Sequence, residues 1–370
     1  MIAWLALAAL VLAALPACLG AVNLIAMRSP AIRRLPDGTL VSILIPARNE
    51  EGNIGAAVEA ALRSTGVAVE VVVMDDGSTD STPAIVAELA ARDPRVRLEG
   101  APPLPEGWTG KVHACFRLAQ AARGTHLLFV DADVRLEPGA AAALVSHAVA
   151  AGTPLVSAVP RQIMRSPGEL LTVPSINLLM LGYLPVPLMR TRPDPSLGAA
   201  CGQMLLAERE AYAAVGGHEA IRTRIHDGLQ LARVFRESGR RTDVVAGARL
   251  ATCRMYRGFG EAWAGFAKNA HEAMATPRAL PVWTVLLFGG HVLPLPLVIA
   301  SGGTSVPAWA ALALSLGLRA AVTLATRENP WSIPLHPATV LTGLAIQWTA
   351  LARNRRGRPA GWKGRLYPAG

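Results

Sequence analysis

Charged and aromatic residues are scarce in this chain, and long apolar runs take their place. Of its 370 residues, 17% are charged and 5% are aromatic, whereas 52% are hydrophobic, and the mean hydropathy is +0.34. An ordinary soluble enzyme carries more charge than this, so the composition excludes that class. The length suffices for one sizeable domain together with membrane-spanning helices.

Cysteine is also rare. The chain has four cysteines, and none of them forms a Cys-x-x-Cys pair or stands at metal-ligand spacing from a histidine. They are Cys18, Cys115, Cys201 and Cys253. We therefore expect neither a disulfide framework nor a zinc site, which suits a protein of a reducing compartment.

Positive charge borders the apolar runs. The formal net charge is +10, and much of it lies at Arg28, Arg33 and Arg34 and in the segment 353–365. Basic residues in such places are typical of the cytoplasmic membrane face rather than of nucleic-acid binding. The nearly uncharged run 1–27 therefore predicts a transmembrane anchor whose carboxyl end faces the cytoplasm. The alternative, a signal peptide, would be shorter and would carry its charge before the apolar stretch.

Apolar runs return in the last hundred residues. Candidate membrane spans are 281–300, 306–326 and 334–352. If all three crossed the membrane, the basic tail would end outside, against the positive-inside rule. We therefore expect 281–300 to be re-entrant or interfacial, and the tail to be cytoplasmic.

A further apolar stretch, 169–189, is interrupted by three prolines. One crossing there would place everything after it on the opposite side of the membrane from the residues before it. We therefore expect a helix that lies in the interface or lines a path for a lipid-like acceptor. A membrane span and a buried core helix are the alternatives.

Between the apolar ends of the chain, short apolar runs alternate with helical patterns. The spacing predicts strands at 40–45, 69–74, 96–98 and 126–130, and helices at 53–63, 82–92 and 111–122. Farther along, it predicts a helix at 225–235, strands at 244–248 and 250–253, and a helix at 261–270. This alternation predicts an α/β fold, with a mostly parallel sheet flanked by helices on both faces.

Carboxylates follow three of the predicted strands. Asp131 and Asp133 come directly after the strand at 126–130, and carboxylates also follow the first two strands. Side chains alternate along a strand, so Asp131 and Asp133 leave the same side. The carboxyl ends of parallel strands form the ligand-binding edge of an open α/β sheet. A lone Asp-x-Asp is common, but three such strand ends predict a site where a divalent cation joins carboxylates to a polyphosphate.

Two further residues are candidate site residues because each lies at or near the start of a predicted helix. Lys111 begins a helix after a turn-rich loop, a place that suits a diphosphate; a solvated lysine is the alternative. Asp227 lies at or near the start of another helix, where it could act chemically or serve only as an N-cap.

Four ordered motifs give the chain a resemblance to a known family. They are Val41-Ser-Ile-Leu-Ile-Pro-Ala-Arg-Asn-Glu-Glu51, Val73-Met-Asp-Asp-Gly-Ser-Thr-Asp80, the Gly110-Lys111 pair and Val130-Asp-Ala-Asp133. Over about residues 39–270 the chain resembles the inverting glycosyltransferases of family 2, which have the GT-A fold. It is also similar to the membrane-bound branch that glycosylates lipids, including carotenoid glucosyltransferases and hopanoid-associated glycosyltransferases. The motifs of that branch are Gly107-Trp-Thr-Gly-Lys111, Gly217-His218, Arg254-Met-Tyr256 and Trp362-Lys-Gly-Arg-Leu-Tyr367.

The resemblance implies a role for each candidate residue. The residues that it implies bind the nucleotide-sugar are Pro46, Arg48, Glu50, Asp76, Lys111 and Asp131. Asp131 and Asp133 hold Mg²⁺ or Mn²⁺, and Asp227 is the general base, a role worth ~10²–10⁴ in rate. The family commonly has Glu-Asp where this chain has His226-Asp227. Arg254 and Arg257 are candidates for contact with a phosphate or an acceptor headgroup, or are charges of the cytoplasmic membrane face.

The predicted activity is inverting, metal-dependent transfer of a sugar from a nucleotide-sugar, with UDP the family's usual nucleotide, to a lipid hydroxyl. The acceptor is a membrane-resident lipid of carotenoid, hopanoid or polyprenyl type, and no nucleic acid takes part. A processive polysaccharide synthase is the alternative within the class. A membrane scaffold with a degenerate sugar-nucleotide domain and a phosphatase with an aspartyl nucleophile are alternatives of other classes.

The expected organisation follows from these predictions. It comprises an anchor (1–27), a GT-A domain (28–270), a membrane region (271–352) and a basic cytoplasmic tail (353–370). The protein would lie in the cell (inner) membrane, crossing it more than once, with its catalytic domain in the cytoplasm.

Overall fold

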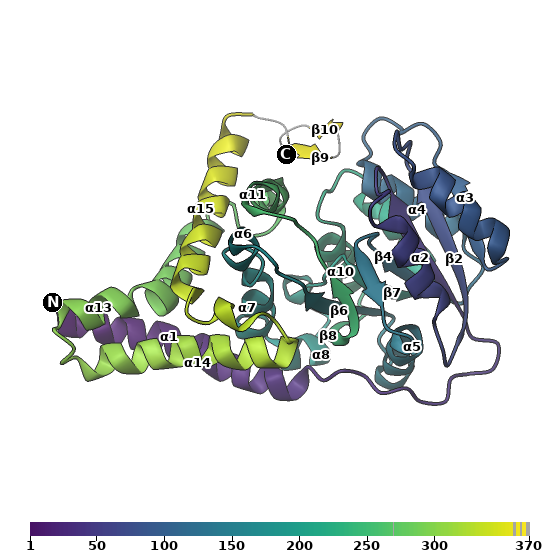
Figure 1. Cartoon of the computed structure of the whole chain (residues 1–370). Coiled ribbons are helices and arrows are strands. Elements are labelled where there is room, and N and C mark those ends of the chain that lie inside the picture. The colour runs from purple at the N-terminus through teal and green to yellow at the C-terminus, as the bar shows by residue number, and fades with distance from the viewer. Residues whose placement is uncertain (269, 358–359, 363–364, 368–370) are drawn as a thin grey trace. The chain divides into compact units, whose positions relative to one another are not determined.

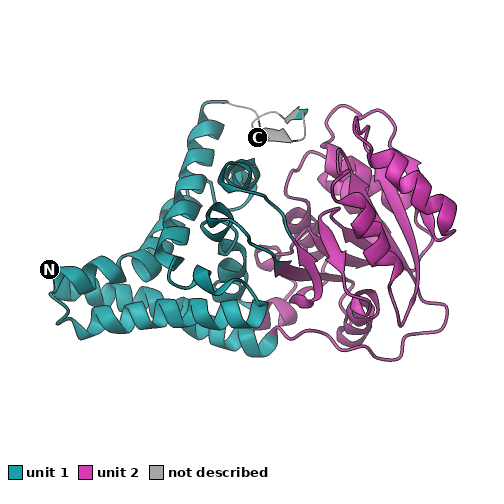
Figure 2. Ribbon diagram, in the orientation of Figure 1, with its two compact units in different colours: residues 1–26, 162–185, 254–370 teal, residues 27–161, 186–253 magenta. Residues whose placement is uncertain are grey.

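The computed structural model describes residues 1–268, 270–357, 360–362 and 365–367 (Figure 1). The chain divides into two compact units, of which unit 1 contains residues 1–26, 162–185 and 254–370 and unit 2 contains residues 27–161 and 186–253 (Figure 2). The predicted catalytic domain, 28–270, matches unit 2 except for two segments that belong to unit 1. Parts of the predicted tail, 353–370, lie outside the described residues.

Unit 2 contains one eight-stranded sheet of order β3-β2-β1-β4-β7-β6-β8-β5. The strands are β1 (Leu40–Ala47), β2 (Ala68–Asp75), β3 (Val96–Gly100), β4 (His126–Val130), β5 (Val134–Leu136), β6 (Leu155–Gln162), β7 (Met204–Glu208) and β8 (Thr242–Cys253). β1 pairs in parallel with β2 and β4, and β2 with β3, whereas β7 is antiparallel to β4 and β6, and β5 to β8. The predicted α/β fold is confirmed. Its parallel part consists of the four strands that the sequence predicted first.

Helices connect the parallel strands, as crossover connections require. The helices of unit 2 are α2 (Ile54–Leu62), α3 (Thr82–Arg92), α4 (Gly110–Ala121), α5 (Ala140–Ala151), α8 (Val186–Thr191), α9 (Arg209–Ala214) and α10 (Asp227–Glu237). The predicted helices that became α2, α3, α4 and α10 are confirmed. In the main core, Leu118 of α4 and Phe235 of α10 pack with Leu44 and Phe129 of the sheet. Each such burial contributes about 1.5–3 kcal/mol, so this core fixes the strand ends.

β8 corrects one prediction. The sequence predicted two strands, 244–248 and 250–253, with a break at Arg249. The structure has one continuous strand, Thr242–Cys253. Arg249 is exposed between buried neighbours, as alternation along a strand allows. Gly247 fits the strand because a Cβ there would lie 2.5 Å from the carbonyl oxygen of Val159.

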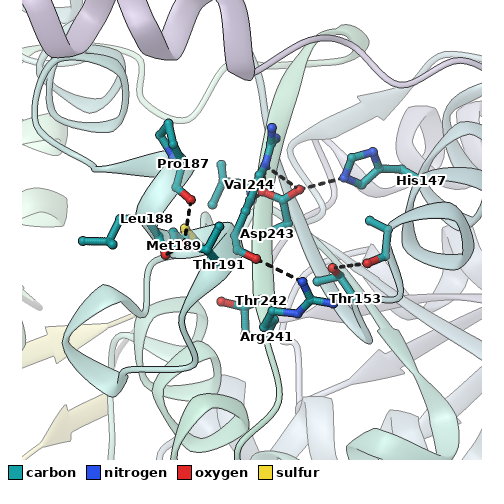
Figure 3. Close-up of polar contacts among 12 residues, drawn as sticks. His147, Thr153, Pro187, Leu188, Met189, Thr191, Arg241, Thr242, Asp243 and Val244 are labelled. Carbon is teal, nitrogen blue, oxygen red and sulfur yellow. Dashed lines mark hydrogen bonds and ion pairs between the residues drawn. The ribbon is translucent and has the colours of Figure 1, made fainter.

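Asp243 at the start of β8 joins two helices to the sheet. Its carboxylate is buried and lies 2.8 Å from Nε2 of His147 on α5 (Figure 3). It also accepts a hydrogen bond of 2.9 Å from Nε of Arg190 on α8. Burial acts to raise the pKa of Asp243, but these two partners lower it, so the carboxylate stays ionised near neutral pH. The short helix α8 is thereby held to unit 2.

Two described helices are long and apolar enough to cross a membrane. They are α1 (Ile2–Ala26) and α14 (Val306–Thr326), at the predicted anchor and at the second C-terminal stretch. Small residues line their packing, since Ala6, Ala9 and Ala13 of α1 form a buried cluster with residues of α13 and α14. Close approach of backbones over small side chains is how helices associate in lipid.

The other C-terminal stretches differ from membrane-crossing helices. Residues 281–300 fold as α12 (Ala279–Leu287), a π-helical turn (Phe288–Val292) and α13 (Pro294–Ala300), with a bend of 50°. Such a bend fits a broken span or a re-entrant loop, so the re-entrant placement stays a prediction. The stretch 334–352 forms α15 (His336–Arg355), which has the length of a span but does not reach its apolarity.

The proline-interrupted stretch 169–189 corresponds to three short helices. They are α6 (Pro167–Leu170), α7 (Ser175–Gly182) and α8. The eight residues of α7 extend over about 12 Å, well under the ~30 Å hydrocarbon core of a bilayer. A single spanning helix is therefore not formed, and an interfacial position stays a prediction.

A buried polar network lies within unit 1. Arg319 of α14 forms an ion pair with Glu328 and donates a hydrogen bond of 2.9 Å to the carbonyl oxygen of Pro174. Asn177 of α7 donates to Glu328 over 2.6 Å. Arg319 is 0% exposed and Glu328 is 5% exposed, so each charge depends on the other for compensation.

Replacing Arg319 alone should therefore destabilise the protein strongly. In an Arg319→Met variant, Glu328 is left buried without its counter-charge, and we expect the free energy of unfolding to fall by about 3–5 kcal/mol. Unfolding of the detergent-solubilised chain measures this. An Arg353→Met variant, which removes an exposed arginine of α15, is the control. The double variant Arg319→Met/Glu328→Gln should regain much of the loss; equal instability of the single and double variants would contradict the ion-pair account.

Candidate active site

The carboxyl ends of β1, β2 and β4 meet at one edge of the sheet of unit 2. Ala47, the last residue of β1, pairs in register with Asp75, and Leu44 pairs with Phe129 of β4. The backbone N–H of Asp76 donates to the carbonyl oxygen of Ala47 over 2.8 Å. The predicted convergence of three strand ends is confirmed.

The loops after β1 and β2 bind each other through many hydrogen bonds. Arg48 donates to the carbonyl oxygen of Asp76, and the backbone N–H of Glu50 donates to Oγ1 of Thr82 over 2.8 Å. Asn49 has a φ of 52°, and its side-chain oxygen accepts from the N–H of Thr79 over 2.8 Å. Asparagine tolerates this left-handed conformation better than most residues. The two loops therefore form one preorganised rim.

Four residues predicted to bind the nucleotide belong to this rim. Pro46, Arg48, Glu50 and Asp76 all lie in it, with Pro46 paired in register with Met74. The side chain of Asp76 is 4% exposed, while Glu50 is more accessible. The structure thus brings the predicted set together, and its assignment to a nucleotide stays a prediction.

Asp131 and Asp133 follow β4. Burial raises the pKa of Asp133 to about 7, with Asp131 and Glu50 adding to the effect. Oδ1 of Asp133 is buried and has no hydrogen-bond partner in the described part of the chain. A buried carboxylate oxygen left unpaired beside a second carboxylate is costly unless a cation compensates it. These oxygen donors fit Mg²⁺ or Mn²⁺, which prefer carboxylate ligands.

Two residues, one just before β7 and one at the end of β8, support both aspartates. The carbonyl oxygen of Gln203 accepts from the N–H of Asp131 over 3.1 Å. The side-chain amide of Gln203 donates to Sγ of Cys253 over 3.1 Å, and the Cys253 thiol in turn hydrogen-bonds the carboxylate of Asp133. Gln203 and Cys253 were not predicted as site residues. They lie 50 residues apart in sequence, and no motif marks them.

Lys111 occupies the centre of the site. Its Nζ lies 2.7 Å from Oδ1 of Asp131 and 2.9 Å from Oδ2 of Asp227. Burial acts to lower the pKa of Lys111, but Asp131 and Asp227 raise it well above its ordinary value, so the ammonium group stays protonated. The solvated-lysine alternative is wrong. The sequence predicted contact with a diphosphate and did not foresee this double ion pair.

The first turn of α4 and the loop before α10 are fixed to each other. The N–H of Thr109 donates to the carbonyl oxygen of Arg222 over 2.9 Å, and its hydroxyl donates to that of Arg224 over 2.7 Å. Thr109 immediately precedes α4, on whose second residue Lys111 stands. Lys111 and Asp227 therefore meet because both of their elements are anchored here.

Asp227 is the first residue of α10 rather than its cap. His226 holds the cap position, so the N-cap alternative is wrong. Oδ1 of Asp227 accepts from the N–H of Gly228 over 2.9 Å, and a Cβ at Gly202 would lie only 2.6 Å from that oxygen. Burial acts to raise the pKa of Asp227, but the ammonium group of Lys111 lowers it. The carboxylate is therefore ionised at neutral pH, as a general base must be.

His218 approaches Asp227 from the other side of this cluster. Its Nδ1 lies 2.8 Å from the hydroxyl of Tyr212, and its backbone N–H donates to the same hydroxyl over 2.9 Å. Gly217 has a φ of 49°, and a Cβ there would lie 2.2 Å from the Tyr212 ring, so only glycine fits. Burial lowers the pKa of His218 to about 4, which leaves the imidazole neutral.

Arg254 and Arg257, the remaining candidates, belong to unit 1 and have partners there. Arg254 donates to the carboxylate of Glu169 over 3.0 Å, and the backbone N–H of Arg257 donates to Glu261 over 2.8 Å. Their assignment to a phosphate or an acceptor headgroup stays a prediction.

Comparison with known proteins identifies a family domain within the chain. Residues 42–216 match the family model described as Glycosyl transferase family 2. The chain carries a glycosyl transferase family 2 domain. This confirms the predicted enzyme class, and a phosphatase with an aspartyl nucleophile is excluded.

Relatives of this glycosyltransferase match most of its length. The 4,4'-diaponeurosporenoate glycosyltransferase of Staphylococcus aureus (strain USA300) is 28% identical over 345 residues, which cover 88% of each chain. Among solved structures, the mannosyltransferase PcManGT of Pyrobaculum calidifontis, in complex with GDP-Man and Mn²⁺, is 20% identical with a TM-score of 0.56. That match covers 93% of this chain and 99% of the other, and it confirms the GT-A-type fold.

Proposed function

We propose that this glycosyltransferase moves a sugar from a nucleotide-sugar donor to a hydroxyl of a membrane-resident lipid, with inversion and with Mg²⁺ or Mn²⁺. The observation that supports it most strongly is the pair of contacts made by Lys111 with Asp131 and Asp227. These contacts place a candidate metal ligand and a candidate base around one cationic group. The proposed lipid acceptor is supported by the two apolar helices of unit 1 and by the carotenoid named for the staphylococcal relative.

Donor binding is assigned to the rim and to the aspartates after β4. Arg48, Glu50 and Asp76 would hold the nucleoside, and Asp131 and Asp133 would hold the cation. The cation, when bound, neutralises charge that develops on the departing diphosphate. Lys111 has a flexible four-carbon side chain, so its ammonium group can pair with the diphosphate instead of with the two aspartates. Such a change of partner would free Asp227.

Asp227 is assigned the role of general base. The acceptor oxygen attacks the anomeric carbon on the face opposite the diphosphate, a new glycosidic bond forms, and the bond to the diphosphate breaks. Asp227 takes the proton that the acceptor hydroxyl loses. Attack from the opposite face inverts the anomeric configuration. The lowered pKa of Asp227 keeps its carboxylate ionised, which is the form that can accept a proton.

The orientation in the membrane is part of the proposal. Arg28, Arg33 and Arg34 follow α1 directly, and the positive-inside rule then places the carboxyl end of α1, and unit 2 after it, in the cytoplasm. Nucleotide-sugars would reach the site there.

A labelled-donor assay tests the proposed function. Membranes containing the chain are incubated with a panel of labelled UDP- and GDP-sugars, with and without a chelator. We expect lipid-extractable label from at least one donor, its loss with the chelator and its recovery with Mg²⁺ or Mn²⁺. The anomeric configuration of the product, determined by NMR, should be opposite to that of the donor. A polymeric product would indicate the processive synthase instead. No transfer from any donor would favour the scaffold.

Removing Lys111 should change the pH dependence of transfer. A Lys111→Met variant loses the charge that lowers the pKa of Asp227, so that pKa rises. A base acts only when deprotonated, and its activity is lost as pH falls through its pKa. The acid limb of kcat/KM should therefore move to higher pH, with a lower rate at its plateau. The control is Arg117→Met, which removes a cation from the same helix; Arg117 donates a hydrogen bond of 2.8 Å to the side-chain oxygen of Gln120. An unshifted acid limb would contradict the role of Lys111.

A further inference from the structure

Three buried side chains of different chemistry converge beside Lys111. The sulfur of Cys115, a ring nitrogen of His218 and a carboxylate oxygen of Asp227 all lie within 4.8 Å of one another. Cys115 is on α4, His218 is on the short 3-10 helix Gly217–Ile221, and Asp227 begins α10. We propose that Cys115, His218 and Asp227 form a second cation site, for a thiophilic divalent ion such as Zn²⁺, and that its occupation inhibits the enzyme.

The donor set points to a different metal from that of the aspartates after β4. Sulfur, imidazole nitrogen and carboxylate oxygen together are the ligands of zinc sites, in which three protein ligands leave a fourth position for water. Mg²⁺ and Mn²⁺ prefer oxygen and gain little from a thiol. Asp131 and Asp133 offer oxygen alone, so the two sites select different ions.

His218 is oriented as a metal ligand requires. The Tyr212 hydroxyl lies 2.8 Å from Nδ1, so Nε2 is the ring nitrogen left for a metal. A hydrogen bond at the second nitrogen is the usual outer support of a metal-bound histidine. Gly217 lets the Tyr212 ring approach closely, which fixes this arrangement. The imidazole is neutral near pH 7, as a ligand must be.

Inhibition follows from competition for Asp227. Oδ2 of Asp227 contacts the ammonium group of Lys111 at 2.9 Å, so a divalent ion bound to this carboxylate would compete with that group. Cys115 is a buried thiol, and its proton would leave to solvent as the sulfur–metal bond forms. A carboxylate that coordinates a metal cannot take a proton from an acceptor. This inhibitory consequence rests on the proposed function of Asp227, whereas metal binding itself does not.

Two measurements on the full-length chain in detergent test the site. In the first, Co²⁺ is added with Mg²⁺ in excess, and the sulfur-to-cobalt charge-transfer band is recorded. We expect the band in the wild type and in Cys18→Ala, which removes an exposed cysteine, and not in Cys115→Ala. Cys115→Ser, which keeps the size of the side chain, serves as a second variant. Absence of the band from the wild type, or its persistence in the Cys115 variants, would overturn the proposal whether or not the sugar-transfer activity is established.

The second measurement is Zn²⁺ inhibition of sugar transfer at saturating Mg²⁺. Full occupation should lower the wild-type rate by ~10²-fold or more, because the general base is lost. Loss of even an outer partner of a metal ligand weakens binding ~10–100-fold, so Cys115→Ala should raise the half-inhibitory Zn²⁺ concentration by at least that factor. Equal Zn²⁺ sensitivity in Cys115→Ala and Cys18→Ala would place the inhibition at another site.

Discussion

An Asp227→Asn variant is expected to transfer sugar ~10²–10⁴-fold more slowly than the wild type. Asparagine has nearly the same shape as aspartate, yet it accepts no proton from an acceptor hydroxyl and carries no charge for Lys111. Donor binding should change little, because Arg48, Glu50 and Asp76 remain in place. Turnover of the identified donor, together with its binding affinity, separates loss of chemistry from loss of binding.

The matched control for this variant is Asp93→Asn. Asp93 lies just before the amino end of β3, whereas the site is at the carboxyl ends of the strands, and it contacts Arg95. It should retain full activity and normal folding. If Asp227→Asn transfers sugar at the wild-type rate, Asp227 is not the base, and the acceptor must lose its proton to another group.

An Asp133→Asn variant is expected to lose divalent-cation binding and about 10³-fold in rate. A cation at the departing diphosphate contributes several kcal/mol to transition-state stabilisation, and each 1.36 kcal/mol is a factor of ten. Mn²⁺ affinity, followed by electron paramagnetic resonance, gives a readout that does not depend on turnover. Since Oδ1 of Asp133 is the unpaired buried oxygen, its loss should weaken Mn²⁺ binding directly.

Although Asp133→Asn should lower cation binding and rate, it should not lower the stability of the folded chain when no cation is bound. The pKa of Asp133 is raised to about 7 in the folded chain. Between about pH 4 and pH 7 this carboxyl is therefore ionised in the unfolded chain and protonated in the folded chain. The free energy of unfolding consequently falls as pH rises through that range. Asparagine carries no such cost. At pH 8 without cation, Asp133→Asn should therefore be at least as stable as the wild type, and added Mn²⁺ should stabilise only the wild type. Loss of folded protein in the variant would mean that the rate loss reports misfolding.

The sequence predicted the parallel half of the fold well because its strands are short, buried and bounded by turn residues. β1, β2 and β4 are such runs, and each ends in residues that cannot continue a buried strand. α5 was not predicted. Its residues from Ala140 to Ser146 are all buried, so the helix has no polar face and gives no amphipathic period.

The site was predicted as a set of residues and not as a geometry. The proximity of Asp131 and Asp133 could be predicted from the strand pattern, since the two residues are close together in the sequence. The contact of Lys111 with Asp227 depends on how the loop at Arg222 meets α4, and no local pattern encodes that. The grouping of Cys115 with His218 was not predicted for the same reason. They are a hundred residues apart, and metal-ligand spacing rules apply to ligands on one segment.

The shared ammonium group of Lys111 restricts how the chain can vary. The ammonium group of Lys111 contacts both Asp131 and Asp227, so substitution of one aspartate changes how strongly Lys111 attracts the other. The effects of the two substitutions are therefore not additive. A neutral residue at position 111 would leave two buried carboxylates facing each other. These three positions form an epistatic unit, and divergent members of the lineage should change them jointly or keep all three.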